Sequence, residues 1–147
     1  MVGGFFMPYF RRWDMPDIEI TLTDNSEEIM AAFRAAAFRA MERCGLKAED
    51  YATKLAPVDT GALRQSISHR ADETQAIIGT NKEYAPYVEL GTGQHYSGGR
   101  PTPWAYQDEK GNWHRTSGQK PQPFLKPAVA DHAQTYKNII EDTMKNG

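Results

Sequence analysis

The chain has 147 residues, with 17 Lys and Arg against 19 Asp and Glu, which gives a formal net charge of −2. This length favours one domain, and the near-neutral charge argues against a general nucleic-acid or membrane-surface binder, which normally has a basic face. A single cysteine, Cys44, excludes an internal disulfide and favours a reducing compartment. No apolar run reaches the ~18–20 residues that span a bilayer, so we expect no membrane contact.

The first 14 residues are rich in apolar side chains, among them Phe5, Phe6, Phe10 and Trp13. A secretory signal carries its positive charge before the apolar stretch, whereas Arg11 and Arg12 follow it here, so we expect no signal peptide. Two interpretations stay open. Met15 is the natural start and residues 1–14 are an upstream extension, or these residues form an apolar arm that folds onto a neighbouring subunit.

A strand and a long helix are predicted next. Residues 17–23 alternate between polar and apolar side chains, with Ile18, Ile20 and Leu22 on one face, which predicts a half-buried strand. Asp24, Asn25 or Ser26 can then cap a helix of about 30 residues, ~45 Å long. Its apolar stripe comprises Met30, Phe33, Ala37, Met41, Cys44, Ala48, Tyr51 and Leu55. Gly45 is a candidate bend or break. A helix this long exceeds a small domain, so we expect part of the stripe to meet another chain.

Shorter elements follow this helix. Pro57 ends it, because the residue before a proline avoids the helical region. The patterns then predict a helical turn over 61–65, strands over 66–70 and 74–79 with Ile77 and Ile78 in the core, and a short helix over 83–90. A glycine-rich loop over 91–103, a hairpin of 104–106 with 112–114, and a last helix over about 125–144 complete the chain.

The predicted elements are segregated rather than alternating, which is typical of the α+β class. We expect a long N-terminal amphipathic helix and a C-terminal helix to pack on a small, mainly antiparallel sheet with hairpins. Residues 15–147 are expected to form a single domain, with an inserted loop and hairpin at 93–118.

No catalytic constellation is evident in the sequence. The four histidines, at 69, 95, 114 and 132, do not lie at metal-ligand spacing with each other, with Cys44 or with a carboxylate. Cys44 falls on the apolar stripe, which favours a buried, inert thiol. The glycine loop lacks the Gly-Lys-Ser/Thr ending of a phosphate-binding loop. We therefore expect no metal, no cofactor and no enzymatic activity. Trp104, Tyr106 and Trp113 are interpreted as a cross-strand aromatic cluster rather than a nucleic-acid stacking platform.

Three segments carry a family resemblance. Residues 56–67 are Ala-Pro-Val-Asp-Thr-Gly-Ala-Leu-Arg-Gln-Ser-Ile, residues 84–92 are Tyr-Ala-Pro-Tyr-Val-Glu-Leu-Gly-Thr, and residues 121–128 are Pro-Gln-Pro-Phe-Leu-Lys-Pro-Ala. In this order the chain resembles the HK97 gp10-like family of tailed-phage neck and tail-completion proteins over roughly residues 15–145. The motif residues are Pro57, Asp59, Thr60, Gly61, Leu63, Tyr84, Glu89, Gly91, Thr92, Pro123, Phe124, Leu125 and Pro127.

The resemblance implies a structural virion protein at the head–tail junction, assembled in the host cytoplasm. It implies a ring of identical subunits, expected to be a hexamer, which joins the tail to the head. Partners are then other neck proteins: a head-completion or stopper protein, a tail terminator and the tail tube, with DNA at most passing through the lumen. The motif residues are expected to have folding roles. Subunit contacts are expected from the N-terminal arm and from His95, Tyr96, Arg100, Trp104, Tyr106 and Trp113.

Two alternatives stay open. A tail terminator that caps the tail tube belongs to the same ring system. A DNA-contacting neck protein belongs to a different class and needs a basic lumen, formed by Arg34, Arg39, Arg43 and Lys47.

Overall fold

The computed structural model describes residues 20–58 and 61–146. Phe5, Phe6, Phe10, Trp13, Asp59 and Thr60 lie outside the described residues, so the expectations for them stay predictions. The elements are α1 (Ser26–Leu55), α2 (Ala62–Ser66), β1 (Ser68–Ala71), β2 (Ala76–Gly79), α3 (Ala85–Leu90), the 3-10 turn η2 (Gly93–His95), β3 (Trp104–Gln107), β4 (Trp113–Thr116), α4 (Leu125–Ala130) and α5 (Ala133–Asn146). Two antiparallel pairs, β1–β2 and β3–β4, form separate sheets in the described part. The predicted α+β class is confirmed.

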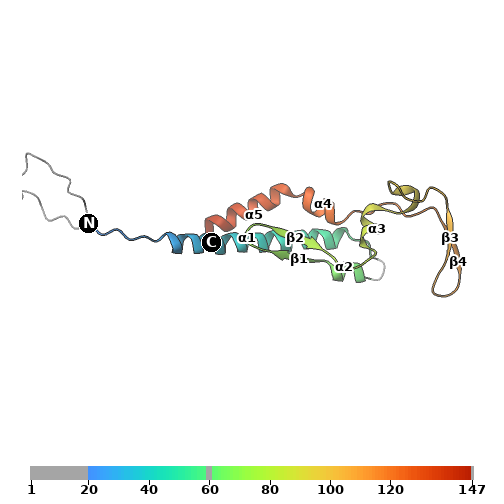
Figure 1. Cartoon of the computed structure of the whole chain (residues 1–147), viewed down its shortest axis with the longest axis horizontal. Helices are drawn as coiled ribbons and strands as arrows, with labels where there is room; N and C mark the ends of the chain where they lie inside the picture. Colours follow the sequence, from blue (N-terminus) through green and yellow to red (C-terminus); the bar gives the residue numbers. More distant parts are fainter. Residues whose placement is uncertain (1–19, 59–60, 147) are drawn as a thin grey trace, which may run out of the picture.

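Helix α1 is the spine of the molecule (Figure 1). Helices α4 and α5 run back along one side of it, the β1–β2 hairpin packs along another, and the β3–β4 hairpin stands at the far end. Arg43 of α1 fixes the α1–α5 contact, because its Nη1 donates to Thr143 Oγ1 at 2.5 Å and to Asp142 Oδ2 at 3.1 Å. The C-terminus therefore lies beside the N-terminal half of α1.

The buried face of α1 is built from small side chains at steps of four, namely Ala36, Ala40, Cys44, Ala48 and Ala52. Such side chains let neighbouring elements approach the helix axis closely. The predicted stripe is thus correct at Cys44 and Ala48 but wrong at its ends. Met30 is 49% exposed and Phe33 is 56% exposed, because residues 26–33 extend beyond the elements packed on the rest of α1.

Gly45 neither bends nor breaks α1, which is continuous. It makes room for His69 of β1 instead: a Cβ at position 45 would lie 2.7 Å from His69 Cδ2. The ring of His69 sits between two carboxylates of α1, with Nδ1 2.5 Å from Glu49 Oε2 and Nε2 3.3 Å from Glu42 Oε2. Gly45 therefore costs helix propensity but allows this hydrogen-bonded contact between α1 and the sheet.

The hydrophobic core is small and lies at the C-terminal end of α1. Its buried members are Ala52, Ala56, Leu63, Ile67, Ala85, Phe124 and Ala128. Phe124 is the only large side chain below 2% exposure among the described residues. Ile78 packs against this cluster as predicted, but Ile77 is 54% exposed, because successive strand residues point to opposite faces and only the face of Ile78 meets the core.

Two predicted elements are wrong in the described part. Residues 20–23 form no strand, and Ile20 and Leu22 are 73% and 92% exposed, because no other strand lies beside them. The predicted last helix is divided into α4 and α5 at Asp131–His132. The carbonyl of Ala128, which would accept from His132 in an uninterrupted helix, accepts the Tyr136 hydroxyl instead.

Candidate functional site

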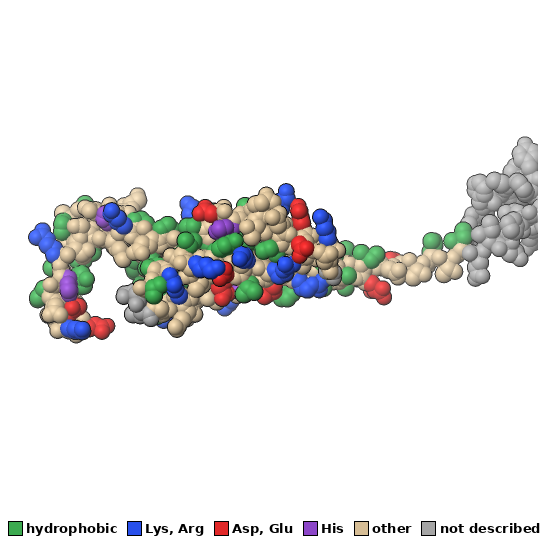
Figure 2. All heavy atoms as spheres, turned by 180° about the vertical axis from the view of Figure 1, so that it is seen from behind, with side chains coloured by type: hydrophobic (Ala, Val, Ile, Leu, Met, Phe, Trp, Pro, Cys, Tyr) green, Lys and Arg blue, Asp and Glu red, His purple; other side chains and the backbone are tan. Residues whose placement is uncertain are grey.

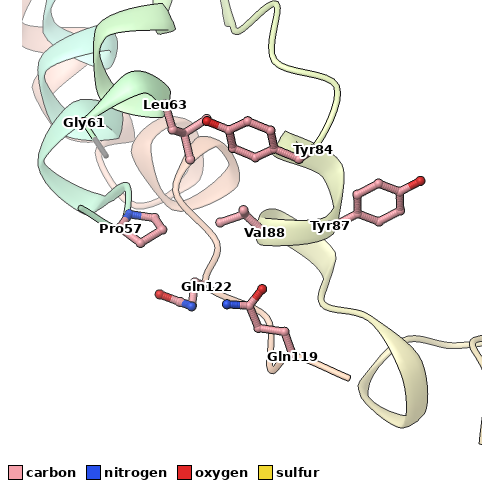
Figure 3. Close-up of a pocket in the computed structure, with 8 residues that line it drawn as sticks. All are labelled: Pro57, Gly61, Leu63, Tyr84, Tyr87, Val88, Gln119 and Gln122. Atoms are coloured by element: carbon pink, nitrogen blue, oxygen red, sulfur yellow. The ribbon is translucent and has the colours of Figure 1, made fainter. Parts of the chain in front are cut away.

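The three motif segments meet in one groove of about 400 Å³ (Figure 3). It is lined by Pro57, Gly61, Leu63, Tyr84, Tyr87, Val88, Gln119 and Gln122. In this view Val88 lies in the middle of the group, the Tyr84 ring extends toward Leu63 above it, and the two glutamines lie below it, whereas Tyr87 points away from them. Four of the predicted motif residues, Pro57, Gly61, Leu63 and Tyr84, thus come together at this corner.

The first motif forms the turn from α1 into the sheet. Ala56 leaves the helix in an extended conformation, with φ −62° and ψ 135°, as expected before Pro57. Gly61 starts α2 in the left-handed region at φ 80°, which favours glycine. Arg64 closes the turn, because its Nε donates to the carbonyl of Ala56 at 2.8 Å. The motif is therefore a corner closed by a side chain of the motif itself.

Glu89 joins the second motif to the third. Its carboxylate accepts the backbone N–H groups of Phe124, Leu125 and Lys126 at 2.8, 3.0 and 2.9 Å. These are orphan donors at the start of α4, which has no cap from its own N-cap side chain. A negative group at a helix N-terminus is stabilising, so Glu89 of α3 caps α4 across 35 to 37 positions in the sequence. These three hydrogen bonds hold the start of α4 where Phe124 enters the core.

The segment after α3 runs beside the segment before α4. The N–H of Thr92 donates to the carbonyl of Gln119 at 2.9 Å, and the N–H of Gln119 donates to Thr92 Oγ1 at 2.8 Å. Gln122 donates to the carbonyl of Val88 at 2.8 Å. A Cβ on Gly91, whose φ is 80°, would lie 2.9 Å from the Gln119 carbonyl oxygen. Glycine therefore permits the close approach of two backbones here, rather than the binding of a phosphate.

Pro123 and Pro127 flank the buried Phe124. Pro123 is exposed, Leu125 is half-buried and packs against the core, and the carbonyl of Pro127 accepts the N–H of Asp131 at the end of α4. The proline and the glycine of the first motif turn the chain, and the prolines of the third motif flank the buried Phe124. Sequence reasoning missed Gln119 and Gln122 as lining residues, and no sequence signal beyond their place just before and at the start of the third motif identified them.

The β3–β4 hairpin projects from the end of the molecule near the groove (Figure 1). The predicted cluster of three aromatics is wrong. Tyr106 pairs with His114 and stacks on it at a ring separation of 5.4 Å, whereas Trp113 pairs with Gln107 on the opposite face and is 71% exposed. Arg100 lies over the Trp104 ring at 5.8 Å. The hairpin thus presents aromatic side chains on both of its faces, Trp104 and Tyr106 on one and Trp113 on the other.

Asp108 organises the turn of this hairpin. Its carboxylate accepts the N–H groups of Lys110 and Asn112 and lies 2.8 Å from His114 Nε2. These bonds, that with His114 above all, hold the pKa of Asp108 below its usual range. His95 and Tyr96 lie in and after η2, nearer the body than the hairpin tip, and Tyr96 is 46% exposed.

Other kinds of functional feature in the described residues would be metal sites, membrane spans, a reactive thiol or unpaired cations. No group of three His, Cys, Asp or Glu residues there could hold a metal ion, and none of the described helices could cross a membrane. Cys44 is 7% exposed, and burial raises the pKa of its thiol. Three cations of α1 are paired with carboxylates, Arg34 with Glu73 at 3.9 Å, Arg43 with Asp142 at 3.1 Å and Lys47 with Asp50 at 3.8 Å.

A comparison with family models finds a match to the HK97-gp10-like family, described as "Bacteriophage HK97-gp10, putative tail-component", over residues 21–91. Residues 21–91 are thus similar to this family. The match contains the first two motifs and ends at Gly91, the residue that packs on the segment leading to the third. The match covers fewer residues than the resemblance inferred from the motifs, which covered residues 15–145. Comparisons with curated proteins and with solved structures gave no match. The family indicates a phage structural protein of the tail-component kind.

Proposed function

We propose that this chain is a non-enzymatic, ring-forming subunit of the phage neck that completes the tail and joins it to the head. The family match over 21–91 carries the proposal. The groove supports it, because the two motif segments inside the match line one corner whose bonds are structural. The partners in this proposal are further copies of the chain and neighbouring neck and tail proteins, and the site of action is the virion.

Two exposed regions at opposite ends of the molecule support a role in assembly. At one end the start of α1 presents Ile29, Met30 and Phe33, which are 65%, 49% and 56% exposed. At the other end the β3–β4 hairpin presents Trp113 on a two-stranded sheet. An isolated two-stranded hairpin is marginally stable in water, so packing against a partner stabilises it. Apolar surface at both ends of an elongated subunit suits contacts with two neighbours.

The DNA-contacting alternative receives less support. Arg34, Arg43 and Lys47 each have a carboxylate within 4 Å, so the surface around each of them is mixed in charge rather than basic. A lumen that attracted DNA strongly would show salt-dependent binding by the isolated protein.

Electron microscopy of particles from a phage that lacks this gene tests the proposal. We expect filled heads beside separate tails, with joined virions restored by the wild-type gene supplied in trans and not by a copy carrying an early stop codon. Tails of abnormal, extended length move the assignment to a tail terminator. Intact, infectious virions without the gene overturn the proposal.

A further inference from the structure

The segment Ile20–Thr23 has the sequence of a strand and no strand partner. Its side chains alternate, with Ile20 and Leu22 on one face and Thr21 and Thr23 on the other, a pattern typical of a half-buried strand. Yet Ile20 and Leu22 are 73% and 92% exposed, and the segment runs away from the body before α1 (Figure 1). Hydrophobic side chains stand out along this narrow segment (Figure 2). Its backbone and its apolar face are both uncovered.

The β1–β2 sheet has an edge that could pair with such a segment. It contains two strands of four residues each, so an outer edge of β1 has no strand beside it in the described part. Such an edge presents unpaired N–H and C=O groups, and an extended segment that joins it gains main-chain hydrogen bonds. A third strand also takes a sheet past the marginal stability of two strands. The segment Ile20–Thr23 has the same length as β1.

The side chains beside this edge fit the segment. His69 of β1 contacts Glu42 of α1, and Phe38 lies one turn before Glu42 on the same face of that helix. Phe38 is 44% exposed. A strand added to β1 with Ile20 and Leu22 facing α1 covers this ring.

The outer face of the sheet carries Arg70 of β1, which is exposed and pairs with the exposed Ile77. If Ile20 and Leu22 face α1, the alternation places Thr21 on this outer face, beside Arg70.

The direction of the chain favours a neighbouring copy as the acceptor. Glu42, which marks the level of β1 on α1, is 16 positions after Ser26, roughly 24 Å along the helix. The segment leaves the start of α1 in the opposite direction (Figure 1). We propose that Ile20–Thr23 of one copy adds as an edge strand to β1 of the next copy. This inference rests on the proposed ring-forming function: a donor at one place and an acceptor at another make a heterologous contact, the type of contact from which rings of identical subunits are built when its rotation closes.

Disulfide trapping between two variants that each carry one introduced cysteine tests the proposal on the full chain. Thr21→Cys protein is mixed with Arg70→Cys protein under mild oxidation, so that any disulfide between the two must join different copies. The matched control replaces Arg70→Cys by Lys137→Cys, an exposed lysine on α5 whose side chain is 66% exposed. Cys44 stays in all variants because it is buried. We expect about tenfold more mixed dimer with Arg70→Cys than with Lys137→Cys, equivalent to about 1.4 kcal/mol.

Three outcomes overturn the proposal. They are equal trapping at positions 70 and 137, predominant dimers of Thr21→Cys with itself, and a Thr21→Cys/Arg70→Cys double variant that forms only an internal disulfide. The last result means that the segment folds onto its own sheet. Leu22→Pro, which removes a ladder donor, is expected to fail to restore virions in the gene-deleted phage. If trapping fails while the wild-type gene restores joined virions, the proposed strand exchange is wrong and the proposed neck function is kept. If the deletion has no effect, the proposed function itself falls.

Discussion

The motif corner and the projecting start of α1 use the same residue type in opposite ways. Phe124 at the corner is fully buried, whereas Phe33 at the start of α1 is 56% exposed. Phe124 follows a proline at the start of α4, and Phe33 lies among alanines within α1. What decides their burial is the presence of other elements of the same chain around Phe124 and their absence around residues 26–33. The comparison teaches that this subunit stabilises one end by itself and leaves the other end for assembly.

The most direct way to break this contrast is to truncate both phenylalanines. Phe124→Ala is expected to cost about 3–5 kcal/mol of unfolding free energy, because it removes a buried ring and leaves a cavity. Phe33→Ala is expected to stay within about 0.5 kcal/mol in the isolated chain. Urea unfolding followed by circular dichroism measures both. A large loss for Phe33→Ala would mean that the start of α1 is already packed in the free subunit.

The long-range cap sharpens the comparison at the corner. Glu89→Ala is expected to cost about 2 kcal/mol, because three backbone N–H groups at the start of α4 lose a charged acceptor. The stability of Glu89→Gln should lie between those of the wild type and Glu89→Ala, since an amide oxygen still accepts hydrogen bonds. Glu83→Ala, an exposed glutamate just before α3, is the control and is expected to change little. Equal effects at positions 83 and 89, measured by the same unfolding experiment, would contradict the capping role.

Substitutions at Gly45 test whether α1 needs a glycine there because of its contact with His69 of the sheet. Gly45→Ala is expected to destabilise by about 1 kcal/mol, because the clash with His69 outweighs a helix-propensity gain of about 1 kcal/mol. In a His69→Ala background the same change is expected to stabilise the protein by about 1 kcal/mol. A double-mutant cycle with no coupling would remove His69 as the reason for this glycine.

The smallest expected effect is a pH dependence from His69. The hydrogen bond with Glu49, opposed by burial and helped by Glu42, raises the pKa of His69 above its ordinary value near 6.5. A group whose pKa is raised on folding stabilises fully below its unfolded pKa and loses that contribution as pH rises through the folded pKa. Wild type should therefore exceed His69→Gln in stability more at pH 6 than at pH 9. A difference that does not change with pH would contradict the ion pair.

Several elements were predictable because their signals are local. The 3.6-residue periodicity and the acidic first turn predicted α1, and Pro57 predicted its end, since these depend on neighbours a few positions away. The β1–β2 hairpin and α3 were predicted within a few residues for the same reason. The motif residues were predicted as a set, but not that Glu89 reaches Phe124, because nothing local connects positions 35 apart.

Other features depend on contacts that sequence periodicity does not encode. The strand predicted over 17–23 has the right alternation, yet its described part lacks a partner within the chain. The last helix is divided because the Tyr136 side chain takes a backbone acceptor from α4. Trp113 leaves the expected aromatic cluster because the register of β3 and β4 places it on the other face.

The sequence by itself determined α1, α3 and the turn at Pro57, and it carries the match of residues 21–91 to the family model, because periodicity, proline, glycine and short motifs act over a few positions. Only the tertiary structure decided which apolar residues are buried, why Gly45 interrupts no helix and how Glu89 caps α4. Those outcomes depend on which elements lie side by side in space, and burial and hydrogen bonding follow from that neighbourhood rather than from position along the chain.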